Sequence, residues 1–368
     1  MKNILFLLVL SFISYTITAQ TGPGGVGNST SNPYWIDIHT NGGANGAAVS
    51  SVTDYSGNGT NAVQSVLTEQ PIFTTNAVNG RSALTFNGGQ CLISPAVSNI
   101  NSPSYINYYV VAQINDYATL SMPFNIDYGT PYYLDAFSGL LVQSGSIKSY
   151  GRNLSNGLKR AEIGNPAGFN VFESRYDLTA TELTSRLNFL TTNTEINVNK
   201  PSPSTNQGFW LGGKSGLYNI SGLISEVFVF NFQLNTAQEK IVQNYISAKF
   251  GTTITNDMYA YETTYGLGVV GIGQDDASNN HLTSQGNGVV RISKNTLNNG
   301  DYLFIGHDDV PLSSMAFDVP VSMVNGARFQ RVWRADETVD IGTITLVFDL
   351  DPSTDFSADP NNYRLLID

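Results

Sequence analysis

The sequence predicts an all-β protein built from two sheet-forming modules, the first of them an antiparallel sandwich. Between residues 34 and 229, short apolar runs alternate with turn-forming segments rich in Gly, Asn, Ser and Pro. The amphipathic helices that a parallel α/β sheet needs between its strands are missing from this stretch. Only 13% of the residues are charged, against roughly 25% in an average soluble domain, and small polar residues and tyrosine take their place.

The chain opens with the features of a secretory signal peptide, which we place at residues 1–19. Lys2 precedes an apolar run over residues 4–13 that is too short to span a bilayer, and Ala19 supplies the small residue before the expected cleavage point. A Gly-rich linker over residues 20–33 follows. We therefore expect an exported chain, secreted or held on the outer cell surface, that does not span a membrane.

The first module is expected over residues 34–251. Three apolar or aromatic runs predict its clearest strands, at residues 83–86, 105–114 and 223–230. The breaks between runs carry residues that favour positive φ or lack a backbone donor. These breaks lie at residues 54–59, 78–80, 201–203 and 212–216.

One helix is expected to close the first module. Thr236 and Glu239 fit a capping box, in which each side-chain oxygen accepts a hydrogen bond from the other residue's backbone N–H. Apolar residues then recur every three to four positions, Lys249 suits the negative helix end, and Gly251 can take the left-handed conformation that ends a helix.

The second module is expected over residues 252–368 and is again β-rich. Its predicted strands lie at residues 289–292, 302–305 and 344–350, with a turn at 298–301. The last run, residues 363–368, has the composition of a strand but no closing turn. This ending predicts that the module is incomplete and that the sequence is a fragment of a longer protein.

Tyr34-Trp35 opens the first module, Asp54-Tyr55-Ser56-Gly57-Asn58-Gly59 follows, and Asn244 to Gly251 ends it. This order of motifs resembles the concanavalin A-like, laminin-G-like jelly rolls of large secreted Bacteroidota proteins. The resemblance implies a jelly-roll sandwich. The second module resembles an uncharacterised domain that often follows such jelly rolls, for example at Gly300 to His307, and this likeness implies no chemistry.

Charge and cysteine content exclude several partners. With 18 basic and 29 acidic residues the net charge is -11, which disfavours nucleic acid. Two Gly-x-Gly-x-x-Gly stretches, at residues 22–27 and 266–271, open no helix, so we expect no nucleotide cofactor. Cys91 is the single cysteine, which rules out an internal disulfide and a thiolate zinc cluster; its apolar neighbours predict a small buried side chain.

No catalytic residues are predicted, and we expect a non-enzymatic protein. The Glu-x-Asp-x-x-Glu arrangement of jelly-roll glucanases is absent from the sequence, and residues 35–39 offer only Asp37 and His39. We expect both to make hydrogen bonds near the first strand. The other histidines, His281 and His307, fit no zinc or nucleophile motif.

A structural calcium ion is the cofactor that the sequence favours. Asp54 and Asn58 supply a carboxylate and an amide around a Gly turn, and the resemblance implies that such a loop can hold calcium, with Glu226 approaching from a later strand. The alternative is an Asx-type turn in which Asp54 caps its own loop. Two weaker acidic candidates lie at residues 275–276 and 349–359.

Aromatic residues offer a possible glycan platform, although strand alternation turns about half of any such run inward. The candidate rings are Tyr108, Tyr109, Tyr132, Tyr133 and Trp210. Core packing is the default interpretation for each of them.

Three functions remain open. The favoured hypothesis is a non-catalytic binding or adhesion module that recognises a glycan or a surface protein. The alternatives are a carbohydrate-active enzyme, or an accessory part of one, and a structural spacer in a longer surface protein.

Overall fold

A computed structural model describes most of the chain, and the remaining segments are left out of the description. The described residues are 22–97, 99–100, 104–126, 138–200, 208–214, 216–286, 289–315, 319 and 327–348. The predicted signal peptide, Tyr132, Tyr133, the acidic series at 349–359 and the final run lie outside them.

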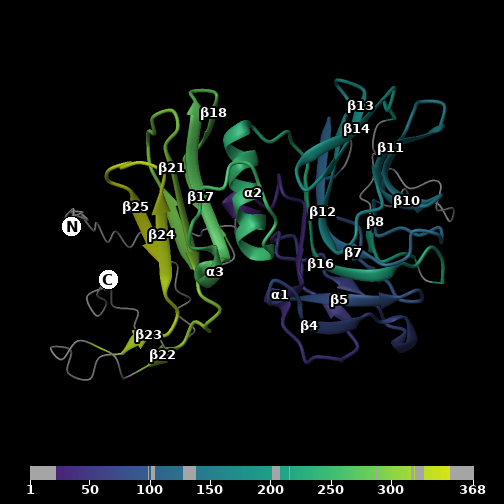
Figure 1. Cartoon of the computed structure of the whole chain (residues 1–368), viewed down its shortest axis with the longest axis horizontal. Helices are drawn as coiled ribbons and strands as arrows, with labels where there is room; N and C mark the ends of the chain where they lie inside the picture. Colours follow the sequence, from purple (N-terminus) through teal and green to yellow (C-terminus); the bar gives the residue numbers. More distant parts are fainter. Residues whose placement is uncertain are drawn as a thin grey trace. The chain divides into compact units, whose positions relative to one another are not determined.

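The chain divides into two compact units, which are considered separately (Figure 1). The larger unit holds residues 27–234 and 249–255. The smaller unit holds the described parts of residues 1–26, 235–248 and 256–368. This division differs from the expected boundary after Gly251, because most of the long helix belongs to the smaller unit.

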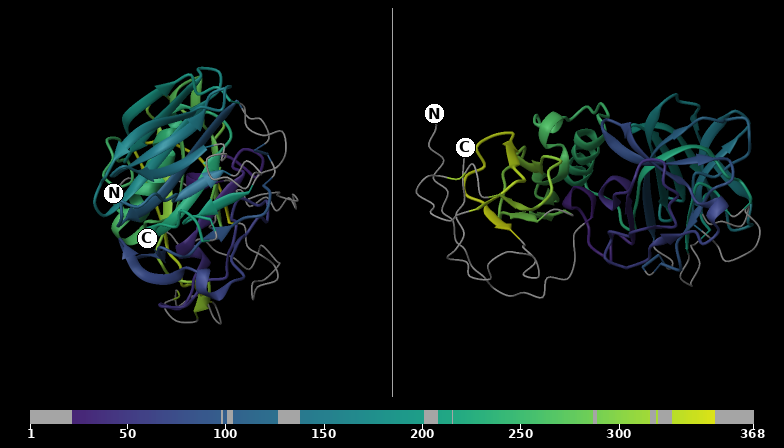
Figure 2. Two further views of the ribbon diagram at one scale, coloured as in Figure 1. Left: turned by 90° about the vertical axis from the view of Figure 1, so that its right-hand side faces the viewer. Right: turned by 90° about the horizontal axis from the view of Figure 1, so that it is seen from below.

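The larger unit is a two-sheet antiparallel jelly-roll sandwich, as predicted, and Figure 2 shows its strands from two further sides. The first sheet contains, in spatial order, β14 (Leu190–Ile196), β13 (Glu182–Leu187), β12 (Phe169–Asp177), β7 (Tyr105–Ile114), β16 (Ser221–Phe230), β5 (Arg81–Asn87) and β4 (Ile72–Val78), with β1 (Tyr34–Asp37) paired to β16. The second contains β11 (Leu158–Gly164), β10 (Ser146–Arg152), β9 (Ser138–Gln143), β8 (Phe124–Ile126), β15 (Phe209–Leu211), β6 (Leu92–Ile93), β3 (Ala62–Val63) and β2 (Ser51–Val52). A 3-10 turn, η2 (Leu67–Glu69), and a one-turn helix, α1 (Ile38–Asn41), lie between strands.

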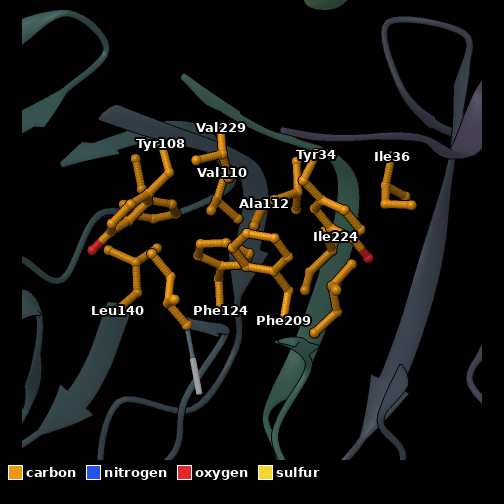
Figure 3. Packing of buried hydrophobic residues seen from close by; sticks show 14 of the residues in the cluster. Tyr34, Ile36, Tyr108, Val110, Ala112, Phe124, Leu140, Phe209, Ile224 and Val229 are labelled. Atoms are coloured by element: carbon orange, nitrogen blue, oxygen red, sulfur yellow. The ribbon is translucent and has the colours of Figure 1, made fainter. Parts of the chain in front are cut away.

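The core lies between the two sheets and is rich in aromatic rings (Figure 3). The ring centroids of Tyr34 and Phe209 are 4.5 Å apart, and those of Phe124 and Phe209 are 5.5 Å apart. Tyr108 is fully buried in the same core. Tyr109 and Trp210 are 2% and 3% exposed, so neither forms an open platform for a sugar. Core packing is therefore confirmed for the three described candidate rings.

The helix α2 (Thr236–Phe250) forms where the sequence predicts it, and Gly251 follows it with φ of 69°. Its capping box begins one residue earlier than predicted. The Asn235 side chain accepts from the backbone N–H of Gln238 at 2.9 Å, and the Gln238 side chain accepts from that of Asn235 at 3.0 Å. Asparagine is a stronger N-cap than threonine. Because Asn235 caps the helix, the Thr236 hydroxyl is available to donate to Asp275.

The smaller unit is the second β-rich module. It contains a four-stranded sheet of β18 (Asn279–His281), β17 (Leu267–Asp276), β21 (Tyr302–His307) and β24 (Trp333–Glu337). A three-stranded sheet of β19 (Thr283–Gln285), β20 (Val290–Ser293) and β25 (Thr345–Phe348), a hairpin of β22 (Ser314–Met315) and β23 (Arg328–Phe329), and the short helix α3 (Glu262–Tyr265) complete it.

Part of the expected Gly-rich linker packs into the smaller unit. The 3-10 turn η1 (Pro23–Gly25) is buried, the hydroxyl of Ser284 donates to the carbonyl of Gly24 at 3.1 Å, and a His281 ring nitrogen lies 2.9 Å from the carbonyl of Gly25. A side chain at Gly25 would collide with Ser284, which explains a glycine there. Within the described residues, no helix has the length and apolar character needed to cross a membrane.

Candidate functional site

Asp54 lies at the base of its predicted loop and caps it. Its carboxylate accepts from the backbone N–H groups of Trp35, Ser56 and Thr60 at 3.0–3.1 Å. It also accepts from the hydroxyls of Ser56 and Thr60 at 2.9 and 2.7 Å. The Asn58 amide donates to two backbone carbonyls of residues 29 and 33. These contacts are those of the Asx-type turn that was the alternative to a calcium loop.

The calcium prediction at Asp54, Asn58 and Glu226 stays a prediction. Among the described residues, no group of three or more His, Cys, Asp or Glu side chains could hold a metal ion. If this loop takes calcium through its amide and backbone oxygens, chelation with EGTA should lower the melting temperature. Saturating calcium at a hundredfold excess over the dissociation constant would stabilise by about 2.7 kcal/mol. Asp54→Asn should then abolish the difference, and equal melting temperatures with and without EGTA would contradict the site.

Glu226 belongs to a buried ionic cluster that the sequence did not reveal. The ammonium of Lys249 lies 2.7 Å from Glu226 Oε2 and 2.8 Å from Asp37 Oδ2, and all three side chains are at most 2% exposed. The indole N–H of Trp35 donates to Glu226 Oε1 at 2.7 Å. The backbone N–H and hydroxyl of Thr40 donate to Asp37 at 3.2 and 2.5 Å. We call these five residues the buried clasp.

Strand register builds the buried clasp. Asp37 ends β1 and lies directly opposite Glu226 on β16, while Lys249 enters from the last turn of α2. Burial by itself would raise the pKa of Asp37, but Lys249 and the hydrogen bonds from Thr40 outweigh burial and hold it below its usual value. Burial likewise opposes the charge of Lys249, yet the two carboxylates raise its pKa. One ammonium thus faces two carboxylates, and all three charged side chains are almost fully buried.

A polar cavity of about 270 Å³ opens on the outer face of the first sheet, and we call it the arginine hollow. It spans strands β7, β12, β13 and β14, which lie side by side in Figure 1. Two arginines, two carboxylates, two threonines, a tyrosine and a glutamine line it: Tyr105, Arg175, Asp177, Glu182, Thr184, Arg186, Thr191 and Gln233. All of these residues belong to the larger unit.

Glu173 positions both guanidinium groups of the arginine hollow. Its side chain is fully buried, and its carboxylate accepts from Arg175 Nε at 2.5 Å and from Arg186 at 2.9 Å. The Asn107 amide donates to the same carboxylate at 3.3 Å, and Arg186 also donates to the carbonyl of Phe189. The side chains of Arg175 and Arg186 remain 18% and 13% exposed. Each is therefore held by the buried Glu173 while part of it still faces the cavity.

The rim of the arginine hollow offers acceptors beside these donors. Asp177 accepts from the backbone N–H groups of Thr179 and Ala180 at 2.8 and 2.9 Å, which fixes its carboxylate in a turn. Glu182 lies opposite Asp177 on β13. A ligand group that both donates and accepts, such as a sugar hydroxyl, matches this mixture of cations and carboxylates.

A second cavity of about 230 Å³ lies near the end of α2 and is less suited to a polar ligand. Val78, Val111 and Phe169 supply apolar walls, and its two amides, Asn170 and Asn188, bond to each other at 3.0 Å.

The remaining predicted residues have structural contacts. Cys91 is buried, in agreement with its apolar neighbours, and accepts from the Gln64 amide at 3.2 Å. His39 accepts weakly from the backbone N–H of Ser82 at 3.4 Å. A ring nitrogen of His307 lies 2.5 Å from the carbonyl of Asp308.

Asp275, one of the weaker metal candidates, ties α2 to the smaller unit's sheet. It accepts from Lys240 at 2.5 Å, from Thr236 at 2.6 Å and from Tyr302 at 2.7 Å. Partial burial would raise the pKa of Asp275, but these hydrogen bonds and the Lys240 charge lower it. Asp276 caps the following turn through the backbone N–H of Ser278 at 2.8 Å.

Acid should therefore weaken the smaller unit through Asp275. A depressed carboxylate pKa contributes stability above its unfolded value, about 3.9, which is lost as the pH falls through the lower folded value. We expect the melting temperature of this unit to fall below about pH 4, and Asp275→Asn to flatten that dependence by up to about 1 kcal/mol, because the pair is partly exposed. An unchanged pH profile in Asp275→Asn would contradict this assignment.

One family model matches part of the chain. The model of a domain of unknown function (DUF8202) matches residues 233–368, less than half of the chain. This match agrees with the expected uncharacterised second module but begins before α2. No curated protein has a matching sequence.

Solved structures resemble the chain only loosely. The binding domain of botulinum neurotoxin serotype D has a TM-score of 0.45 and 11% identity, covering 76% of this chain and 72% of that one. Domain 4 of a GH43 extracellular arabinanase from Geobacillus stearothermophilus, in complex with arabinotriose, has a TM-score of 0.42 and 14% identity, covering 58% and 97%. A Trypanosoma rangeli sialidase has a TM-score of 0.40 and 15% identity, covering 62% and 35%. All three scores are below 0.5, so nothing about function follows from them.

The arginine hollow was missed at the sequence level, although a signal for it exists. Glu173, Arg175 and Asp177 alternate along one strand, which places them on one face. Arg186 recurs on the next strand. Charged residues of opposite sign that alternate with apolar and aromatic residues along a strand indicate a polar face on that side of the sheet.

Proposed function

We propose that the larger unit is the binding module of an exported protein and that it takes a hydroxyl-rich ligand, such as a surface glycan, in the arginine hollow. One observation carries the proposal: Glu173 holds Arg175 and Arg186 at the floor of an open cavity whose rim carries carboxylates and hydroxyls. Side chains fixed in advance lose little conformational entropy when a ligand binds. A rigid sheet face is therefore a suitable base for recognition.

Binding should depend on exposed residues of the hollow that the fold does not need. Thr191 and Gln233 are exposed and line the cavity, so the double variant Thr191→Val and Gln233→Ala should fold normally. Two lost hydrogen bonds, each about 1 kcal/mol, predict affinity about tenfold weaker or more. The measurement is a glycan array with neutral and acidic oligosaccharides, followed by titration of the best ligand.

The matched control is Asn193→Ala, because Asn193 is exposed on the same strand as Thr191 but does not line the cavity. The Asn193→Ala variant should bind the ligand with the same affinity as the unmodified chain. Equal binding by the double variant, or no binding by the parent to any glycan or surface protein, would contradict the proposal. Release of reducing sugar by the purified chain would favour the enzyme alternative.

A further inference from the structure

We propose that the buried clasp forms an amide bond between Lys249 Nζ and the side-chain carboxyl of Asp37, with Glu226 as the catalytic acid and base. The inference rests on the clasp itself and is independent of the arginine hollow. Its product is a covalent cross-link between the first strand and the last segment of the larger unit, within a single chain.

The reacting groups are already in contact. Lys249 Nζ lies 2.8 Å from Asp37 Oδ2, one bond away from the carbon that it would attack. Reacting atoms held about 3–3.5 Å apart in fixed geometry gain effective molarities on the order of 10⁵ M or more. Here the geometry is fixed by strand pairing, since Asp37 and Glu226 are opposite residues of β1 and β16.

The surroundings favour condensation over hydrolysis. The three charged side chains are at most 2% exposed, and the rings of Trp35 and Tyr55 pack edge to face with centroids 6.2 Å apart. Tyr55 is half-buried beside the clasp, and burial and the nearby Asp37 raise its pKa to about 12. Burial opposes the charge of both Asp37 and Lys249, although their mutual attraction outweighs it in the resting pair. The neutral tautomer, an amine beside a carboxylic acid, is therefore a minor state through which the reaction passes.

Glu226 touches the nitrogen that reacts, and its second oxygen is held by Trp35. In the first step the Lys249 ammonium gives a proton to Glu226, which passes it to Asp37, leaving a neutral amine and a neutral acid. The amine attacks Asp37 Cγ and forms the C–N bond. Glu226 then removes a proton from nitrogen and delivers it to the departing hydroxyl as the C–O bond breaks.

The atoms and charges balance without an added reagent. An ammonium and a carboxylate become one amide and one water, and Glu226 ends as it began, as a carboxylate. Thr40 supports the step, because its N–H and hydroxyl already donate to the two Asp37 oxygens and can stabilise the charge that develops there.

Mass spectrometry of the purified full chain tests the proposal. We expect an intact mass lower than the sequence mass by one water. Because dehydration elsewhere in the chain gives the same mass, a tryptic digest decides the position. Acylated Lys249 resists trypsin, so the peptide of residues 241–291 should be joined to the peptide that ends at Arg81 and contains Asp37.

Two variants assign the roles. Glu226→Gln keeps the Lys249–Asp37 pair and should show the full sequence mass with normal circular dichroism, and Asp37→Ala should also show the full mass. Lys159→Met, which breaks a partly exposed ion pair with Glu195, should retain the loss of one water. A folded parent chain with the full mass and normal cleavage after Lys249 would overturn the proposal, and a cross-link that persists in Glu226→Gln would overturn the role of Glu226.

Discussion

Replacing Lys249 with Met is expected to lower the free energy of unfolding of the larger unit by about 3–5 kcal/mol, or to prevent folding. Methionine has a similar length, so the change removes charge with little change in packing. It leaves Asp37 and Glu226 as buried carboxylates facing each other without their shared cation. Since total stabilities are about 5–15 kcal/mol, this loss is a large share of the whole.

Chemical denaturation of the full chain, followed by tryptophan fluorescence, measures the loss. Lys159→Met is the matched control, because its ion pair with Glu195 lies in the same unit with side chains 27% and 30% exposed. An exposed pair contributes about 1 kcal/mol or less. A Lys249→Met variant as stable as Lys159→Met would show that the clasp contributes no more than a surface pair.

A variant without any charge in the clasp separates electrostatics from packing. Combining Lys249→Met with Asp37→Asn and Glu226→Gln removes the ammonium and both carboxylates together. Because isolated buried charges cause most of the penalty, the triple variant should be more stable than Lys249→Met alone. Glu226→Gln keeps the Lys249–Asp37 ion pair but should lack the cross-link. Comparing its free energy of unfolding with that of Lys249→Met then shows how much of the stability lost in Lys249→Met comes from the missing cross-link.

Local structure was predictable because it depends on neighbouring residues. An aromatic and β-branched run predicted the strand at residues 105–114, with the same ends as β7. The helix was predicted from its 3.6-residue period, and its terminator Gly251 was correct. The capping box was displaced by one residue, because the Asn235 side chain caps the N–H of Gln238 and the Thr236 hydroxyl donates to Asp275 instead.

The buried clasp was not predictable, because each of its charged residues has a sufficient local explanation. Lys249 complements the negative end of a helix, Asp37 was expected to make hydrogen bonds near the first strand, and Glu226 was assigned to calcium. Their meeting depends on the register of β1 against β16 and on where α2 ends, which no local pattern encodes. Charged residues set within apolar runs are the one signal that they share, since such positions are buried only when paired.

The second large effect on stability is expected at Glu173, which holds the two arginines of the arginine hollow. Glu173→Gln should lower the free energy of unfolding by about 3 kcal/mol, because a fully buried carboxylate that pairs with two guanidiniums becomes neutral. Arg175 and Arg186 then repel each other across adjacent strands. Glutamine keeps the shape of the side chain, so the loss reports charge and not a cavity.

Glu195→Gln is the control for this change, because Glu195 also lies in the first sheet and pairs with Lys159, but its side chain is 30% exposed. It should cost no more than about 1 kcal/mol. Glu173→Gln should also weaken ligand binding when measured below its melting temperature, since the arginines lose the anchor that orients them. If stability falls and binding is unchanged, Glu173 only stabilises the sheet, and recognition must take place elsewhere than at the two guanidiniums. If neither changes, the carboxylate does not organise the hollow, and the structural basis of the proposed binding site is wrong.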